Sequence, residues 1–213
     1  MNAIADFKNL SPTTVADVAG RQQVMDIGIR PLWSPIPRIA GPAFTVRCAA
    51  GDNLMLHAAI HLAEPGSVIV VEAGDVDYAV SGGNVCAVAQ HRGIAGFVVD
   101  GVIRDLGEVR GIGFPVFGRG VIPVPGGKQV VAPLNEPVRC GGIDVAAGDV
   151  VVADEEGIVV IPNARWEEVF SEAEAKLTKD AAESLDEWEQ DHRARIGEIL
   201  KEKGFTGWSL PDS

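Results

Sequence analysis

The sequence has little that would commit it to a membrane or to a nucleic acid. No apolar run approaches the roughly 18 residues that span a bilayer, and the N-terminal MNAIADFKNL has no basic segment leading into an apolar one. There are 18 basic residues against 30 acidic ones, so the Lys-rich and Arg-rich surface that binds nucleic acid phosphates is missing. We therefore expect a protein with no membrane segment and no nucleic acid partner.

Cysteine is also scarce. Cys48, Cys86 and Cys140 are odd in number, far apart and without CxxC spacing, which argues against a disulfide framework and against a zinc ribbon. A reducing cytoplasm is the expected compartment. The rest of the composition, 46% hydrophobic and 23% charged over 213 residues, is that of a globular protein with one sizeable core.

Short Val-rich and Ile-rich runs at residues 67–73 and 95–101 predict buried strands. Residues 53–63 and 84–93 carry apolar side chains at helical spacing. Strands that alternate with helices predict a parallel sheet in this part of the chain.

After Pro115 the pattern changes to short apolar runs broken by Gly, Pro and DEEG. These runs predict a β meander that ends in a hairpin; they are PVFGRG (115–120), QVVAP (129–133), PVRCGGIDV (137–145) and DVVVADEEGIVVIP (149–162). The predicted core, residues 1–163, is therefore α/β, with a βαβα front of parallel strands and a β-rich back.

Residues 164–203 contain no Pro and one Gly, and their apolar residues recur at threes and fours. This spacing predicts an amphipathic helix or a helix pair. A lone helix must bury its apolar stripe, so we expect the C-terminal extension, residues 164–213, to pack on a neighbouring chain. The alternative is that it folds back on its own core.

Gly82 and Gly83 come just before the predicted helix at 84–93. Backbone N–H groups at the positive end of a helix can hold a carboxylate, although an ordinary strand-to-helix turn would read the same way. Arg104 follows the next strand, and the carboxyl ends of adjacent parallel strands are where open α/β sheets bind ligands. The glycines and the guanidinium together predict one anion site.

Asp105 and Glu108 have two interpretations. D-x-x-E is the spacing of a capping box, in which Asp caps a helix and Glu reaches back. The same spacing puts both carboxylates on one face of a first helical turn, where they could hold a hard divalent cation directly or through its waters.

Two other pairs are more simply explained by structure. His57 and His61 are four residues apart, but the sequence lacks the Glu of a HExxH motif and an obvious third zinc ligand, so we expect two partly buried helix residues. Asp75 and Asp77 follow another strand end, and we expect them to be turn residues rather than supports of the site.

Six stretches in this order resemble the RraA-like family, which includes the class II 4-hydroxy-4-methyl-2-oxoglutarate (4-carboxy-4-hydroxy-2-oxoadipate) aldolases. They are GPAFTVRC (41–48), GDNLMLHAAI (51–60), Gly82-Gly83, VVDGVIRD (98–105), GFPVFGRG (113–120) and CGGIDVAAGDVVVADEEGIVVIP (140–162). The resemblance implies a swivelling β/β/α fold and a homotrimer or dimer of trimers with sites between subunits. It also implies cleavage of a 2-oxo acid with release of pyruvate, dependent on Mg²⁺ or Mn²⁺.

Carried over by position, the resemblance places the substrate carboxylate against Arg104 and the backbone amides of the turn, and the metal on Asp105. The amides are those of Gly82, Gly83, Asn84 and Val85. The aldolases proper carry an Asp where this chain has Gly83. Glu108 instead matches a subgroup with an acidic residue three positions after the metal-binding Asp, and members of that subgroup look able to decarboxylate oxaloacetate.

The implied reaction is retro-aldol cleavage of a 4-hydroxy-2-oxo diacid, oxaloacetate decarboxylation, or both, through a metal-stabilised enolate. A Schiff-base route would need a buried lysine, and Lys128 is the core's single lysine after Lys8 and stands in a Gly/Pro loop. That loop, VIPVPGGK (121–128), departs from the polar stretch of many relatives. The competing function is that of a non-catalytic RraA-type regulator that binds a ribonuclease.

Overall fold

The computed structural model describes residues 4–208. The first three residues of the N-terminal stretch and the last five of the extension lie outside this range. The chain divides into two compact units, a core unit up to Glu174 and a tail unit from Ala175 onward.

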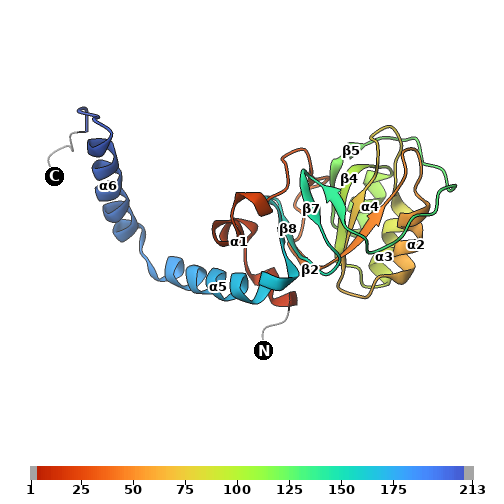
Figure 1. Ribbon diagram of the computed structural model, residues 1–213, viewed down its shortest axis with the longest axis horizontal. Helices are drawn as coiled ribbons and strands as arrows, with labels where there is room; N and C mark the ends of the chain where they lie inside the picture. Colours follow the sequence, from red (N-terminus) through yellow and green to blue (C-terminus); the bar gives the residue numbers. More distant parts are fainter. Residues whose placement is uncertain (1–3, 209–213) are drawn as a thin grey trace. The chain divides into compact units, whose positions relative to one another are not determined.

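A seven-stranded sheet with the order β1-β5-β4-β3-β2-β8-β9 forms the centre of the core unit (Figure 1). Strands β2 to β5 pair in parallel, whereas β1, β8 and β9 join antiparallel. The strands are β1 Arg30–Pro31, β2 Ile39–Arg47, β3 Val68–Glu72, β4 Gly96–Ile103, β5 Val116–Val121, β6 Val138–Cys140, β7 Ile143–Val145, β8 Val150–Asp154 and β9 Gly157–Ile161. The predicted α/β class and the parallel front are confirmed.

Three helices connect the parallel strands and lie on one side of the core unit (Figure 1). Their apolar faces share one buried cluster with the strands, and the other face of the sheet is covered too, so the strands are nearly continuous runs of Val and Ile. The helices are α1 Pro12–Ala19, α2 Leu54–Leu62, α3 Gly83–His91, α4 Leu106–Ile112, α5 Trp166–Ala182 and α6 Leu185–Glu202, with 3-10 helices at Ile4–Asn9, Arg21–Gln23 and Asn163–Arg165.

The predicted β meander is wrong in two places. The run at 115–120 becomes β5 and belongs to the parallel sheet, and the run at 129–133 is an irregular loop. Three prolines between 122 and 134 remove backbone donors that a strand would need. Strands β6 and β7 form a separate two-stranded sheet, and β8 with β9 is the expected hairpin.

The extension is a pair of helices, as predicted, and Ser184 begins the second. Its hydroxyl accepts a hydrogen bond from the Glu187 backbone N–H, and the Glu187 carboxylate accepts one from the Ser184 N–H. The first turns of α5 belong to the core unit, where Phe170 packs edge-on against Phe7. No residue of α6 is buried within residues 4–208, and Trp188 is 48% exposed. Packing of α6 on a neighbouring chain stays a prediction.

A search of residues 4–208 finds no helix both long and apolar enough to cross a membrane.

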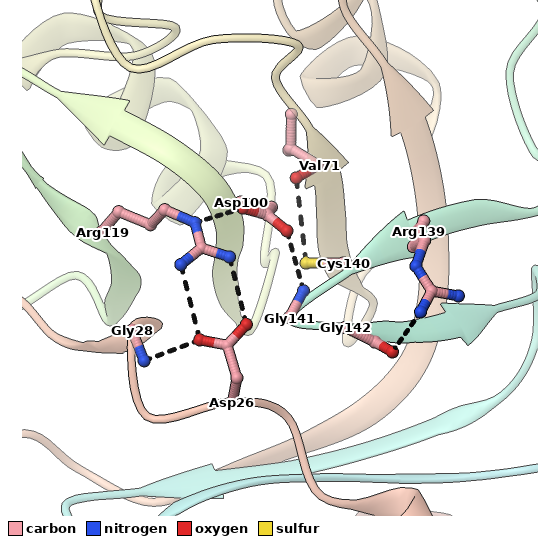
Figure 2. A network of polar contacts seen from close by, with 9 residues as sticks. All are labelled: Asp26, Gly28, Val71, Asp100, Arg119, Arg139, Cys140, Gly141 and Gly142. Atoms are coloured by element: carbon pink, nitrogen blue, oxygen red, sulfur yellow. Dashed lines mark hydrogen bonds and ion pairs between the residues drawn. The ribbon is translucent and has the colours of Figure 1, made fainter.

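One polar network ties together segments that are distant in the sequence (Figure 2). Arg119 on β5 pairs with Asp100 on β4 and donates to both carboxylate oxygens of Asp26. The second oxygen of Asp100 accepts a hydrogen bond from the Gly141 N–H, in the turn between β6 and β7, at 2.9 Å. The hydrogen bonds from Arg119 hold the pKa of Asp26 below its ordinary value of 3.8. Asp100 thus links the β6–β7 turn to the large sheet, and the Arg119 guanidinium joins Asp100 to Asp26.

We predict that Arg119→Met lowers the free energy of unfolding by about 2 kcal/mol, because it leaves two partly buried carboxylates without their charged donor. Asp26 adds stability that is present above pH 3.8 and lost as the pH falls through its lowered pKa, so the variant should also lose less stability on acidification. Denaturant unfolding at pH 7 and pH 3 measures both effects. Arg139→Met, which breaks an ion pair exposed on both sides, is the control and should cost less than about 1 kcal/mol.

We also predict that deleting residues 184–213 weakens assembly and leaves the core unit folded. Helix α6 buries nothing within its own described chain, so its loss should change the melting temperature only through contacts with another copy. Light scattering and thermal melting are the measurements. A truncated protein with the same number of subunits and the same melting temperature as the full chain would contradict packing on a neighbour.

Candidate functional site

The turn before α3 and the turn before α4 lie side by side, at the carboxyl ends of β3 and β4. The Arg104 N–H donates to the Ser81 carbonyl at 2.9 Å, and the Gly83 N–H donates to Asp105 Oδ2 at 3.2 Å. Parallel topology therefore brings the two glycines and the Arg-Asp pair together, as the sequence indicated.

Helix α3 begins at this turn without a side chain to cap it. Gly82 is extended, and the Gly83 N–H is taken by Asp105. Among the described residues, the backbone N–H groups of Asn84 and Val85 have no acceptor. Such open donors at a helix N-terminus are suited to a carboxylate.

Asp105 does not act as a helix cap. Its backbone is left-handed, with φ 56° and ψ 36°, and its side chain makes no hydrogen bond to the first turn of α4. The capping-box interpretation of Asp105 and Glu108 is therefore wrong, and the box at Ser184 shows what that arrangement looks like in this chain. A left-handed residue other than glycine costs free energy and is enriched at functional sites.

The two carboxylates lie directly over the glycine pair. A Cβ on Gly82 would lie 2.5 Å from Asp105 Oδ2, and a Cβ on Gly83 would overlap the Glu108 carboxylate. Glycine at both positions therefore permits this close approach, and a larger residue would push the carboxylates away. No third carboxylate, His or Cys completes a metal-binding cluster within residues 4–208. Two hard oxygen donors fit a cation such as Mg²⁺, which keeps several waters and takes one or two carboxylates.

A cavity of about 80 Å³ opens between these turns. Two cations, one carboxylate and one imidazole meet in it. Its lining residues are Asn53, His57, Ala79, Ser81, Gly82, Asn84, Val85, Arg104, Asp105, Pro125 and Lys128. Glu108 is not among them. The Arg104 guanidinium contacts Asp105 through its Nε atom, which lies 3.4 Å from Asp105 Oδ2. Its two Nη groups therefore remain available to a ligand.

Lys128 and Asn53 were not among the site residues that the sequence predicted, although the structure confirms that Lys128 stands in a loop. Backbone hydrogen bonds fold that loop over the start of α2, where Asn53 N–H donates to the Gly127 carbonyl at 2.8 Å. The buried carboxylate of Asp52 accepts from the Gln129 and Val130 N–H groups. Burial would raise the pKa of Asp52, but these donors outweigh it and the pKa is lowered. No spacing in the sequence signals this contact.

His57 also lines the cavity, whereas His61 is exposed on the same helix. Burial, then the positive charges of Lys128, His61 and Arg104, lower the pKa of His57 below 6.5. The predicted helical position of both residues is confirmed.

Asp75 acts as a turn residue, as expected, and accepts hydrogen bonds from the Asp77 and Tyr78 N–H groups. Asp75 and Asp77 do not line the cavity.

Fold and cavity together define the class of protein. It is an α/β protein with a small cavity, lined by charged side chains, at the carboxyl ends of adjacent parallel strands, where such folds bind ligands. The chain belongs to the RraA-like family, since the family model described as Aldolase/RraA matches residues 4–160.

Individual relatives agree with this assignment. The chain is 38% identical over 180 residues to a protein of Halalkalibacterium halodurans named "Putative 4-hydroxy-4-methyl-2-oxoglutarate aldolase", covering 84% of this chain and 85% of that protein. It is similar to an uncharacterised protein of Pseudomonas syringae, with a TM-score of 0.74, 28% identity and 83% of each chain covered. It also resembles the RNA-processing inhibitor RraA of Thermus thermophilus, with a TM-score of 0.66 and 25% identity, covering 76% of this chain and 94% of that one.

We predict that Gly83→Ala weakens divalent cation binding, because the new Cβ would displace the Glu108 carboxylate. Overpacking of this kind costs about 1–3 kcal/mol. Titration with Mn²⁺ followed by calorimetry measures the affinity. Gly107→Ala on α4, where a Cβ meets no atom within 4 Å, is the matched control and should leave the affinity unchanged. Equal Mn²⁺ affinities for the two variants would show that Glu108 does not contribute to cation binding.

Proposed function

We propose that this protein is a divalent-metal-dependent lyase that releases pyruvate from a small 2-oxo acid. The reaction is retro-aldol cleavage of a 4-hydroxy-2-oxo diacid, decarboxylation of oxaloacetate, or both. The observation that carries the proposal is the convergence of a turn with open N–H donors, a guanidinium and the Asp105 carboxylate on one small cavity, with the Glu108 carboxylate packed against Gly83 beside it. The name of the Halalkalibacterium relative supports the aldolase form.

In this proposal the C1 carboxylate of the substrate binds between the α3 turn and Arg104. The open N–H groups of Asn84 and Val85 face one side of it, and the Nη groups of Arg104 face the other. Charge-assisted hydrogen bonds from two sides fix the orientation of the 2-oxo group.

Asp105 would hold the metal directly, and Glu108 would hold it through water. Mg²⁺ or Mn²⁺ bound there would supply positive charge beside the reacting 2-oxo group. The left-handed backbone of Asp105 and its bond to the Gly83 N–H fix its carboxylate before substrate arrives. This preorganisation is what an electrostatic site requires.

Lys128 is placed to meet the far end of a diacid. Its ammonium group lines the same cavity as Arg104 and has no ion pair within residues 4–208. The buried Asp52 carboxylate is close enough to feel its charge, and the second carboxylate of a diacid would give the ammonium group a direct partner that a monoacid lacks. We therefore favour diacid substrates for either reaction.

The competing function is that of a regulator that binds a ribonuclease, suggested by the name of the Thermus structure. A regulator needs no metal and no pyruvate chemistry, so the charged cavity would have no purpose in it. We also propose a homotrimer or dimer of trimers in the cytoplasm, as the family resemblance implies. Light scattering tests that assembly independently of catalysis.

We predict metal-stimulated pyruvate release, which Asp105→Asn abolishes in a folded protein. The change keeps an oxygen and removes the charge that binds a hard cation. Glu108→Gln should lower the rate of pyruvate release by about 10- to 100-fold, because a carboxylate that binds the metal through water contributes less than a direct ligand. Arg104→Lys should also lower this rate by about 10- to 100-fold, because lysine cannot make the two parallel hydrogen bonds of a guanidinium to the substrate carboxylate.

The assay couples pyruvate to lactate dehydrogenase, with oxaloacetate and with branched 4-hydroxy-2-oxo diacids, in Mg²⁺, Mn²⁺ or chelator. Arg110→Lys, on the exposed face of α4, is the control variant and should retain full activity. Wild-type protein that releases no pyruvate from any substrate with either metal would overturn the proposed function.

A further inference from the structure

Retro-aldol cleavage needs a group that takes the proton from the C4 hydroxyl. Asp105 and Glu108 are assigned to the metal, and Arg104 and Lys128 are cations that have no proton-accepting lone pair at neutral pH. Among the side chains that line the cavity, an imidazole is the group suited to accept a proton near neutral pH.

His57 stands on α2, is half-buried and lines the cavity. Within residues 4–208 its ring nitrogens have no hydrogen-bond partner. The charged groups around it are Lys128 from the loop at 122–134, Arg104 and Asp105 from the end of β4, and His61 from its own helix. The ring is therefore free to accept a hydrogen bond from a ligand in the cavity.

Its surroundings keep the ring neutral. Burial and the three positive neighbours place the pKa of His57 below 6.5, so the free base is the main form at pH 7. A neutral ring has a lone pair that can accept a proton. The same neighbours oppose the imidazolium that forms, which favours rapid loss of its proton to solvent.

We propose that His57 is the catalytic base that takes the C4 hydroxyl proton during aldol cleavage; this rests on the proposed lyase function. The O–H bond breaks and an N–H bond forms on the ring. The O–H electron pair becomes the C4 carbonyl bond, and the C3–C4 pair becomes the C2–C3 double bond of the enolate. The imidazolium then releases its proton to solvent, and C3 takes a proton from water to give pyruvate. No oxidant or reductant is needed.

This role distinguishes the two reactions of the site. Oxaloacetate has no C4 hydroxyl, and its decarboxylation breaks the bond between C3 and a carboxylate without removing a hydroxyl proton. Binding of the C1 carboxylate, the metal and the enolate is common to both substrates. A change at His57 should therefore slow aldol cleavage selectively.

The test compares His57→Gln with the wild-type protein on 4-hydroxy-4-methyl-2-oxoglutarate and on oxaloacetate, each with Mg²⁺. A general base contributes about 10²- to 10⁴-fold, so kcat for aldol cleavage should fall about 100-fold or more, with KM nearly unchanged. Oxaloacetate decarboxylation should stay within about threefold. His91→Gln, an exposed change in the last turn of α3, should leave both rates unchanged.

Two further measurements separate a base from a merely structural residue. Wild-type aldol cleavage should decline as the pH falls through the lowered pKa of His57, and ring NMR of the same protein should show that residue titrating below 6.5. In His57→Ala, added imidazole should restore part of the aldol activity. If His57→Gln is poorly folded, this rescue in the Ala variant carries the test.

Equal loss of both reactions in His57→Gln, or loss of neither, would overturn the proposal. Failure of imidazole to rescue a folded His57→Ala protein would also count against it. If the wild-type protein acts on oxaloacetate but not on hydroxy-oxo acids, the proposed role of His57 is disproved and the proposed lyase function is retained. If it acts on neither substrate, the proposed lyase function is itself disproved.

Discussion

The candidate site depends on two consecutive glycines, Gly82 and Gly83, which have no side chains. Because Gly82 and Gly83 present bare backbone, the turn that begins α4 can approach the turn that begins α3, and the carboxylates of Asp105 and Glu108 come to lie over the peptide between the glycines. The approach has a cost, since Asp105 must adopt a left-handed backbone. A hydrogen bond from the Gly83 N–H offsets part of it. The groups proposed to bind the substrate carboxylate and those proposed to bind the metal therefore come from the same few residues, which suits a 2-oxo acid that chelates a metal.

The charge of the cavity is opposite to the charge of the protein. The whole chain carries a net charge of −12, yet Arg104 and Lys128 line the cavity with one carboxylate, Asp105. Local fields in a cleft are set by the nearest charges and not by the total. A small anion is thus attracted at short range by a protein that repels anions at long range. A bound divalent cation would strengthen the local attraction further.

The sequence predicts those parts of the site that follow from chain order. Buried strands at 67–73 and 95–101 put Gly82 and Arg104 at one edge of the sheet, because parallel strands end on the same side. It does not predict Lys128, whose position depends on Asp52 binding a backbone segment 77 residues away. It leaves Asp105 undecided, since D-x-x-E spacing is shared by a capping box and by a pair of ligand carboxylates. The local spacing of apolar residues predicts helices and strands, but a contact between two irregular loops has no periodic pattern in the sequence.

Strand β4 is distorted shortly before Arg104. The pairing of β4 with β5 shifts register between Val99 and Val102, at the point where Asp100 reaches out to Arg119 and to the β6–β7 turn. A bulge bends a strand and re-aims the residues that follow it. Gly101 lies at this irregularity, where a Cβ would overlap that of Ala73, the residue that follows β3. The network shown in Figure 2 therefore does more than link the β6–β7 turn to the large sheet. It also holds Asp100, which stands in the distorted part of β4 and four residues before Arg104.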